Sequence, residues 1–227
     1  MAFDPDHVET VTVDSYGTLV DPSAAEATLA EHVADPRPIS TLWRSRSLSY
    51  TMVSNFVDAY QPFYEMNRDA LGYALESHDI DLEAGTIDEI LSVYHELDVF
   101  DDVRDGLERL TEAGYEVYVL SNGNPEMLES MVDHADIDSV VSDTISAHEI
   151  CTFKPDVELY RHAAGRAGTP IEAISHVAGP SFDVQGAMHA GMHGVWLDRS
   201  AGPWDPFGEK PDLTVETFQE FADELGA

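Results

Sequence analysis

Residues 10–19 of the chain read Thr-Val-Thr-Val-Asp-Ser-Tyr-Gly-Thr-Leu, and this stretch decides the predicted fold. Its first four residues are β-branched, which favours a β-strand. A carboxylate, Asp14, follows directly, and Gly17 ends the extended run. In open α/β sheets, ligands bind beyond the carboxyl ends of the strands. The stretch therefore predicts a first strand that carries an acidic side chain into a ligand site.

The rest of the chain alternates between strand-like and helix-like segments. Further strands are predicted at residues 115–120, 139–142, 174–177 and 194–197. Helices are predicted between and after them, at about 101–113, 125–134, 156–167, 183–190 and 214–225. Such alternation is typical of a parallel sheet covered by helices on both faces. We therefore predict an α/β fold with a Rossmann-like parallel sheet core.

Residues 22–94 interrupt this alternation. No strand is evident there, and the segment reads as three or four helices rich in Leu, Tyr, Phe and Met. We interpret it as a helical cap subdomain inserted after the first strand. The core domain would then consist of residues 1–21 and 95–227.

The charge of the chain is unusual. It has 44 acidic residues, 11 basic residues and a formal net charge of −33. Nucleic acid would be repelled by such a surface, so no nucleic-acid partner is expected. The simpler interpretation is an ordinary acidic protein. The scarcity of lysine, with only Lys154 and Lys210, favours a protein built for molar salt, as in halophilic archaea.

Nothing in the sequence predicts contact with a membrane or export. No apolar run approaches the roughly 20 residues that a membrane helix needs. The first residues lack the basic and apolar regions of a signal peptide. The single cysteine, Cys151, cannot form an internal disulfide. We predict a cytoplasmic protein with no membrane partner.

Four polar clusters fall at the predicted carboxyl ends of strands or in the loops that follow them. Each one alone is better explained by a turn, a solvated helix start or a helix cap. Their order along the chain and their shared placement indicate a single site. The clusters are Asp14 to Leu19, Ser121-Asn122-Gly123, Lys154-Pro155 and Phe182-Asp183.

This order of clusters resembles the haloacid dehalogenase-like superfamily over nearly the whole chain. Several details resemble its L-2-haloacid dehalogenase branch more specifically. They are Tyr16 two residues after Asp14, Leu42-Trp43-Arg44 followed by Leu48 and Tyr50-Thr51, and Phe153-Lys154-Pro155 followed by Tyr160.

The chemistry of the reaction agrees with that branch. Phosphatases of the superfamily usually place a second Asp two residues after the nucleophile, where it protonates a poor leaving group. A halide leaves without a proton, and Tyr16 occupies that position here. Phosphatases also hold Mg²⁺ with an acidic pair in the fourth cluster, where this chain has Gly179 and Asp183. We therefore expect no metal and no cofactor.

The resemblance implies a two-step covalent mechanism on a small 2-halocarboxylate. Asp14 displaces the halide from C2, and water then hydrolyses the ester to a 2-hydroxyacid. By the same resemblance, Lys154 keeps Asp14 ionised, and Thr18 and Ser121 bond the nucleophile or the substrate carboxylate. Asp183 orients Lys154 and the hydrolytic water.

The resemblance also assigns a halide cradle and a substrate pocket. Arg44, Asn122 and Phe182 form the cradle. For Leu48 and Phe63, plain packing within the cap is an equally good interpretation. The residues expected to bind substrate are Ser15, Tyr16, Leu48, Phe63, Tyr160 and Phe182. A homodimer is a further expectation from the resemblance.

The fourth cluster departs from the pattern of the branch, which usually carries Ser and Asn ahead of the final Asp. This chain has Ala178 and Pro180 nearby, which lack polar side chains. Two alternatives stay open at this point. One is a Mg²⁺-dependent phosphatase acting on a small phosphorylated metabolite. The other is a catalytically weak binding protein on the same scaffold.

Overall fold

The structure is a computed structural model that describes residues 3–227. Its centre is a six-stranded parallel sheet with the order β3-β2-β1-β4-β5-β6. The first strand of the sequence lies in the middle, so that Asp14 emerges at the centre of the carboxyl edge. The strands are β1 (Thr10–Val13), β2 (Glu116–Ser121), β3 (Asp143–Ser146), β4 (Ile174–Ala178), β5 (His193–Leu197) and β6 (Leu213–Val215). The predicted α/β fold is confirmed.

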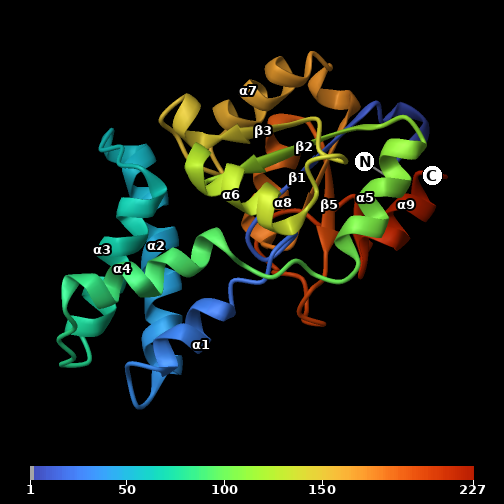
Figure 1. The fold of residues 1–227 in the computed structure, drawn as a ribbon. Coiled ribbons are helices and arrows are strands. Elements are labelled where there is room, and N and C mark those ends of the chain that lie inside the picture. Colours follow the sequence, from blue (N-terminus) through green and yellow to red (C-terminus); the bar gives the residue numbers. More distant parts are fainter. Residues whose placement is uncertain (1–2) are drawn as a thin grey trace.

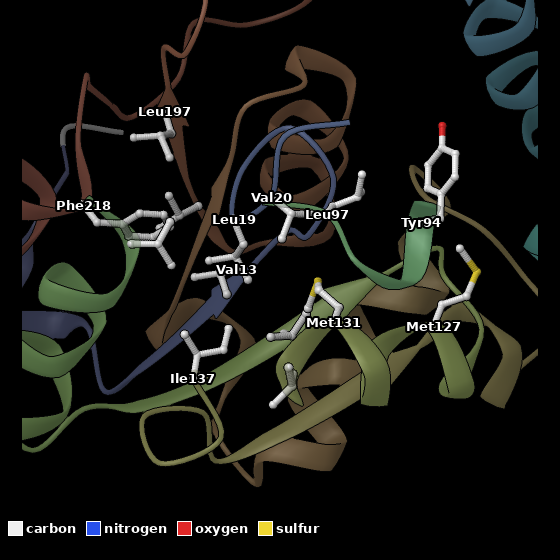
Figure 2. Close-up of a cluster of buried hydrophobic side chains, with 14 of the residues drawn as sticks. Val13, Leu19, Val20, Tyr94, Leu97, Met127, Met131, Ile137, Leu197 and Phe218 are labelled. Carbon is white, nitrogen blue, oxygen red and sulfur yellow. The ribbon is translucent and has the colours of Figure 1, made fainter. Parts of the chain in front are cut away.

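Helices cover both faces of the sheet, as the alternation predicted (Figure 1). One face packs against α5 (Val103–Glu112), α6 (Pro125–Ala135) and α9 (Phe218–Glu224). Val13, Leu19, Met131, Leu197 and Phe218 meet in this core layer (Figure 2). The other face packs against α7 (Val157–Ala167) and α8 (Ser181–Ala190). Short 3-10 helices span Pro5–His7, Val93–His95, Ala147–Glu149 and Ile171–Ala173.

Four helices between β1 and α5 lie to one side of the sheet (Figure 1). They are α1 (Ala24–Ala30), α2 (Pro36–Val57), α3 (Phe63–Glu76) and α4 (Ala84–Ser92). The predicted cap falls on this segment, and its boundaries at residues 22–94 stay a prediction.

The chain leaves and re-enters the sheet region at one place. The amide of Asp21 donates to the carbonyl of Asp98 at 2.9 Å. The amide of Phe100 donates to the carbonyl of Leu19 at 3.1 Å. Val20 also forms an antiparallel bridge with Val99. The outgoing and returning segments are therefore paired side by side.

Two details of the predicted elements were wrong. A strand was predicted at 139–142, but β3 is Asp143–Ser146, because Val140 turns back on Ile137 and both side chains pack into the core. The last helix was predicted from residue 214, but Leu213–Val215 is the edge strand β6, and α9 begins at Phe218 after the N-cap residue Thr217.

No helix among residues 3–227 is long and apolar enough to cross a membrane.

Candidate active site

Asp14 sits on a loop that is held from several sides. Its carboxylate Oδ2 accepts a 2.7 Å hydrogen bond from the hydroxyl of Thr18. That hydroxyl in turn accepts from the amide of Gly179 at 2.9 Å, which fixes its direction. Gly17 adopts a φ of +83°, a conformation that favours glycine, and so lets the loop turn back on itself. Arg199 also donates to the Thr18 carbonyl at 2.9 Å.

A buried lysine joins the two acidic residues of the site. Lys154 Nζ lies 2.8 Å from Asp14 Oδ1 and 2.6 Å from Asp183 Oδ2. The lysine is 1% exposed, and its backbone amide donates to Asn122 Oδ1 at 2.9 Å. A cation placed between two carboxylates favours the charged form of all three groups.

The pKa values of the three groups show what burial and pairing do. Burial lowers the pKa of Lys154, but the two carboxylates outweigh it and hold that pKa above its ordinary value. Burial raises the pKa of Asp14 above its ordinary value, although Lys154 and Thr18 oppose the shift. Burial acts in the same direction on Asp183, but Lys154 and then His176 outweigh it and lower the pKa of that carboxyl. Pairing with Lys154 and His176 therefore favours the ionised form of Asp183.

Asp183 is held on its other oxygen as well. It lies in the first turn of α8, and the hydroxyl of Tyr160 on α7 donates to its Oδ1 at 2.7 Å. The Nε2 atom of His176 lies 3.1 Å from the same oxygen. Sequence reasoning missed His176. The available signal was a histidine inside a short strand whose other residues are apolar apart from Ser175.

A cavity of about 200 Å³ opens in front of Asp14, between the carboxyl edge of the sheet and α2 and α3. Eight residues of the predicted site line it: Asp14, Tyr16, Arg44, Leu48, Phe63, Asn122, Lys154 and Phe182. Five lining residues were not predicted: Pro22, Ser47, Asn67, Tyr94 and Pro180.

The remaining predicted residues lie behind this cavity wall. Thr18 and Asp183 reach the site through Asp14 and Lys154, as described above. Ser15 and Ser121 are fully buried, and their hydroxyls share a 2.6 Å hydrogen bond. Tyr160, expected to bind substrate, is fully buried and contacts Asp183 instead of lining the cavity.

The family model for haloacid dehalogenase-like hydrolases matches residues 8–187. The chain belongs to this family. A curated relative, (S)-2-haloacid dehalogenase 4A of Burkholderia cepacia, is 33% identical over 87% of this chain and 86% of its own length. The (S)-2-haloacid dehalogenase of Pseudomonas sp. (strain YL) is 29% identical over 94% of this chain and 93% of its own.

Solved structures of dehalogenases share the whole fold. One, described as a dehalogenase, superposes with a TM-score of 0.92 at 30% identity and covers 98% of this chain and 99% of its own. An L-2-haloacid dehalogenase superposes with a TM-score of 0.93 at 26% identity, over 97% of this chain and 99% of its own. The similarity therefore extends over the sheet and over helices α1–α4 together.

In this member of the family, aromatic rings form one side of the cavity. Tyr16 stacks on Phe63 with centroids 6.1 Å apart, and it forms a T-shaped pair with Tyr94, with centroids 5.6 Å apart. Burial raises the pKa of Tyr16, and its buried hydroxyl has no hydrogen-bond partner in the described part of the chain. At neutral pH the group facing Asp14 at this position is a neutral phenol.

Besides Lys154, a second cationic side chain of the cavity comes from α2. Arg44 lines the cavity and is 45% exposed, with Nη2 3.7 Å from Glu26 Oε2. Its neighbour Trp43 is fully buried and donates to the carbonyl of Asn67 on α3 at 2.9 Å. The buried indole fixes this turn of α2, and the weak pairing leaves the Arg44 guanidinium available to an anion.

The fourth cluster holds no second acid. A Cβ atom at Gly179 would lie 2.5 Å from the carbonyl oxygen of Gly17, so any side chain there would push on the loop of the nucleophile. Within residues 3–227, no group of three or more His, Cys, Asp or Glu side chains is arranged to hold a metal ion.

Proposed function

We propose that the protein is a 2-haloacid dehalogenase that converts (S)-2-haloacids to (R)-2-hydroxyacids through an ester on Asp14. The observation that carries this proposal is the environment of Asp14. Its carboxylate is fixed by Lys154 and Thr18 at the floor of a largely apolar cavity, and Tyr16 stands where a proton donor would assist a poor leaving group. The similarity to (S)-2-haloacid dehalogenases supports the same substrate class.

In the first step, a carboxylate oxygen of Asp14 attacks C2 of the substrate from the side opposite the halide. The carbon–oxygen bond forms as the carbon–halogen bond breaks, and the electron pair leaves with the halide. The configuration at C2 inverts. Arg44, Asn122 and Phe182 line the same cavity and would receive the halide, whose charge develops only in the transition state.

In the second step, water attacks the ester carbonyl carbon on Asp14. The 2-hydroxyacid leaves with its new oxygen from Asp14, the carboxylate regains an oxygen from water, and one proton is released. Asp183 is 1% exposed and binds Lys154 from behind, so its contribution is to orient that ammonium group beside the ester. Ala178 and Pro180 offer no polar side chain to the water, so we expect this step to be the slow one.

The decisive experiment follows halide release from L-2-chloropropionate with and without EDTA. Wild-type protein should release chloride equally well in both conditions. Asp14→Asn should release none, because an amide is not a competent nucleophile, while Asp69→Asn on the exposed face of α3 should behave as wild type. If hydrolysis of p-nitrophenyl phosphate with Mg²⁺ replaced halide release, the protein would be a phosphatase.

The covalent step has its own test. During a single turnover in ¹⁸O-labelled water, the label should enter the peptide that contains Asp14 and be absent from the product. Label found directly in the 2-hydroxyacid would mean that water, and not Asp14, attacks the substrate.

The setting of the enzyme is also part of the proposal. The net charge of −33 supports a cytoplasm of high salt concentration, where a short Debye length relieves the repulsion between carboxylates. A homodimer stays a prediction, which sedimentation in molar KCl would test.

A further inference from the structure

A histidine lies in the middle of the buried strand β4. His176 is fully buried, and every residue of β4 around it is buried as well. Its ring meets the ring of Tyr160 edge to face, with centroids 5.6 Å apart. Burying an imidazole costs free energy unless its nitrogen atoms find partners. The polar atoms around the two nitrogens therefore decide how well this ring is accommodated.

Both ring nitrogens face polar atoms. Nδ1 lies 2.8 Å from the hydroxyl of Thr12 on β1, and Nε2 lies 3.1 Å from Oδ1 of Asp183. An ionised carboxylate can only accept hydrogen bonds, so its proximity favours the tautomer with a proton on Nε2. In the neutral ring Nδ1 then accepts, and the Thr12 hydroxyl donates. The Nε2 contact is close but does not have the geometry of a hydrogen bond, whereas the Tyr160 hydroxyl donates to the same oxygen at 2.7 Å.

We propose that His176 is a positioning residue of the dehalogenase, which acts on the nucleophile through Asp183 and Lys154. With Tyr160 it occupies Oδ1 of Asp183, so that Oδ2 is left to face Lys154 Nζ at 2.6 Å. Lys154 in turn holds Asp14 at 2.8 Å. The proposal rests on the proposed function, because its effect is measured on dehalogenation.

This arrangement accounts for the apolar side chains of the fourth cluster. Ala178 and Pro180 cannot hold Asp183 or Lys154 through their side chains. His176 lies two residues before Ala178 on the same strand and reaches Asp183 from inside the protein. Support for Asp183 therefore comes from the face of the sheet rather than from the loop above it.

The test compares three variants by steady-state kinetics. His176→Phe keeps a ring of similar size but removes the contact with Asp183. We expect kcat to fall roughly 10-fold to 100-fold, by analogy with the loss seen when a residue that orients a metal ligand is removed. KM should change less than threefold, because His176 does not line the cavity. His176→Gln offers a donor and an acceptor again and should recover most of kcat.

Thr12→Val is the matched control for a merely structural role. It removes the hydrogen bond on the far side of the ring and leaves the contact with Asp183 in place. It should lower the melting temperature but reduce kcat less than His176→Phe does. The proposal is wrong if the decrease in kcat is proportional to the decrease in melting temperature for both variants. It is also wrong if His176→Phe keeps kcat within threefold of wild type.

A measurement on the wild-type protein separates this proposal from the proposed function. Nitrogen NMR of the ring should show a proton on Nε2 of His176, and Asp183→Asn should shift that signal. A proton on Nδ1 would overturn the proposal even in an active enzyme and even if His176→Phe does not fold. Absence of halide release by the wild-type protein would refute the dehalogenase function, whatever the tautomer.

Discussion

Replacing Lys154 by Met should affect both stability and catalysis, in a way that depends on pH. The substitution keeps most of the side-chain volume but removes the positive charge between Asp14 and Asp183. The three side chains are 2%, 10% and 1% exposed, so little water can take over the role of the ammonium group. Two buried carboxylates would then face each other without a cation.

Removing one partner of a buried ion pair typically costs about 3–5 kcal/mol. For a chain of this length, each kcal/mol lowers the melting temperature by about 2–4 °C, so we expect a decrease of roughly 6–20 °C at neutral pH. Turnover should be lost as well, because an uncompensated Asp14 becomes protonated and is no longer a nucleophile.

The loss of stability should shrink as the pH falls. Without Lys154, burial holds the pKa values of both carboxyls above their values in the unfolded chain. A group of this kind adds stability below its unfolded pKa, and that stability is lost as the pH rises through the folded pKa. In the wild-type protein, the pKa of Asp183 is lowered. Its ionised carboxylate therefore stabilises the fold at neutral pH, and this contribution is lost as the pH falls. The two stability curves should therefore converge toward acid pH.

Urea unfolding between pH 4 and pH 8 in molar KCl would measure this. Lys210→Met, which changes the exposed lysine, is the matched control and should match wild type. Combining Lys154→Met with Asp183→Asn should recover part of the stability. A Lys154→Met protein as stable as the control at pH 8, or one whose deficit does not depend on pH, would refute the assigned electrostatics.

Three further outcomes are expected. The melting temperature should rise from low salt to molar KCl because of the net charge of −33, and a flat or falling curve would contradict adaptation to salt. Arg44→Ala should slow halide release more than ester hydrolysis, since Arg44 meets charge that develops in the first step; rapid-quench single turnovers would separate the two, and equal losses would argue against this role. The pKa of Asp14 is raised by burial, so kcat/KM should fall on acidification above the ordinary carboxyl pKa of 3.8, and a pH–rate profile that stays flat down to that value would disagree.

The sheet and the main site could be predicted because parallel strands end at one edge. Asp14, Lys154 and Asp183 are far apart in sequence, yet strand alternation alone brings their loops together. The position of β3 could not be predicted in this way. The β-branched residues Val140 and Val141 are typical of a strand. In the structure, however, Val140 lies in the turn after α6 and packs its side chain into the core.

Contacts between side chains on neighbouring strands could not be predicted from the sequence either. His176 and Thr12 meet because β4 pairs with β1 in a register that sets these two residues opposite each other. Neither residue belongs to a local motif. In the same way, Asn67 and Tyr94 join the cavity only through the packing of α3 and of the 3-10 helix at Val93–His95, which spacing within either element does not reveal.

The pairing of the outgoing and returning segments at Asp21 and Asp98 has a mechanical consequence. Because both crossings lie at one place, a rotation of helices α1–α4 about it would leave the hydrogen bonds between the strands intact and would break those of Tyr64 and Asn55 to the sheet region. The cavity takes Arg44 and Leu48 from the swinging side and Asp14 and Asn122 from the other, so such a movement would separate its walls and release the hydroxyacid. A more viscous solvent should then slow turnover, and the backbone amide of Tyr64, which donates to Asn124 Oδ1 across the two walls at 2.9 Å, should exchange with deuterium faster than the amide of Asp21 at the crossing.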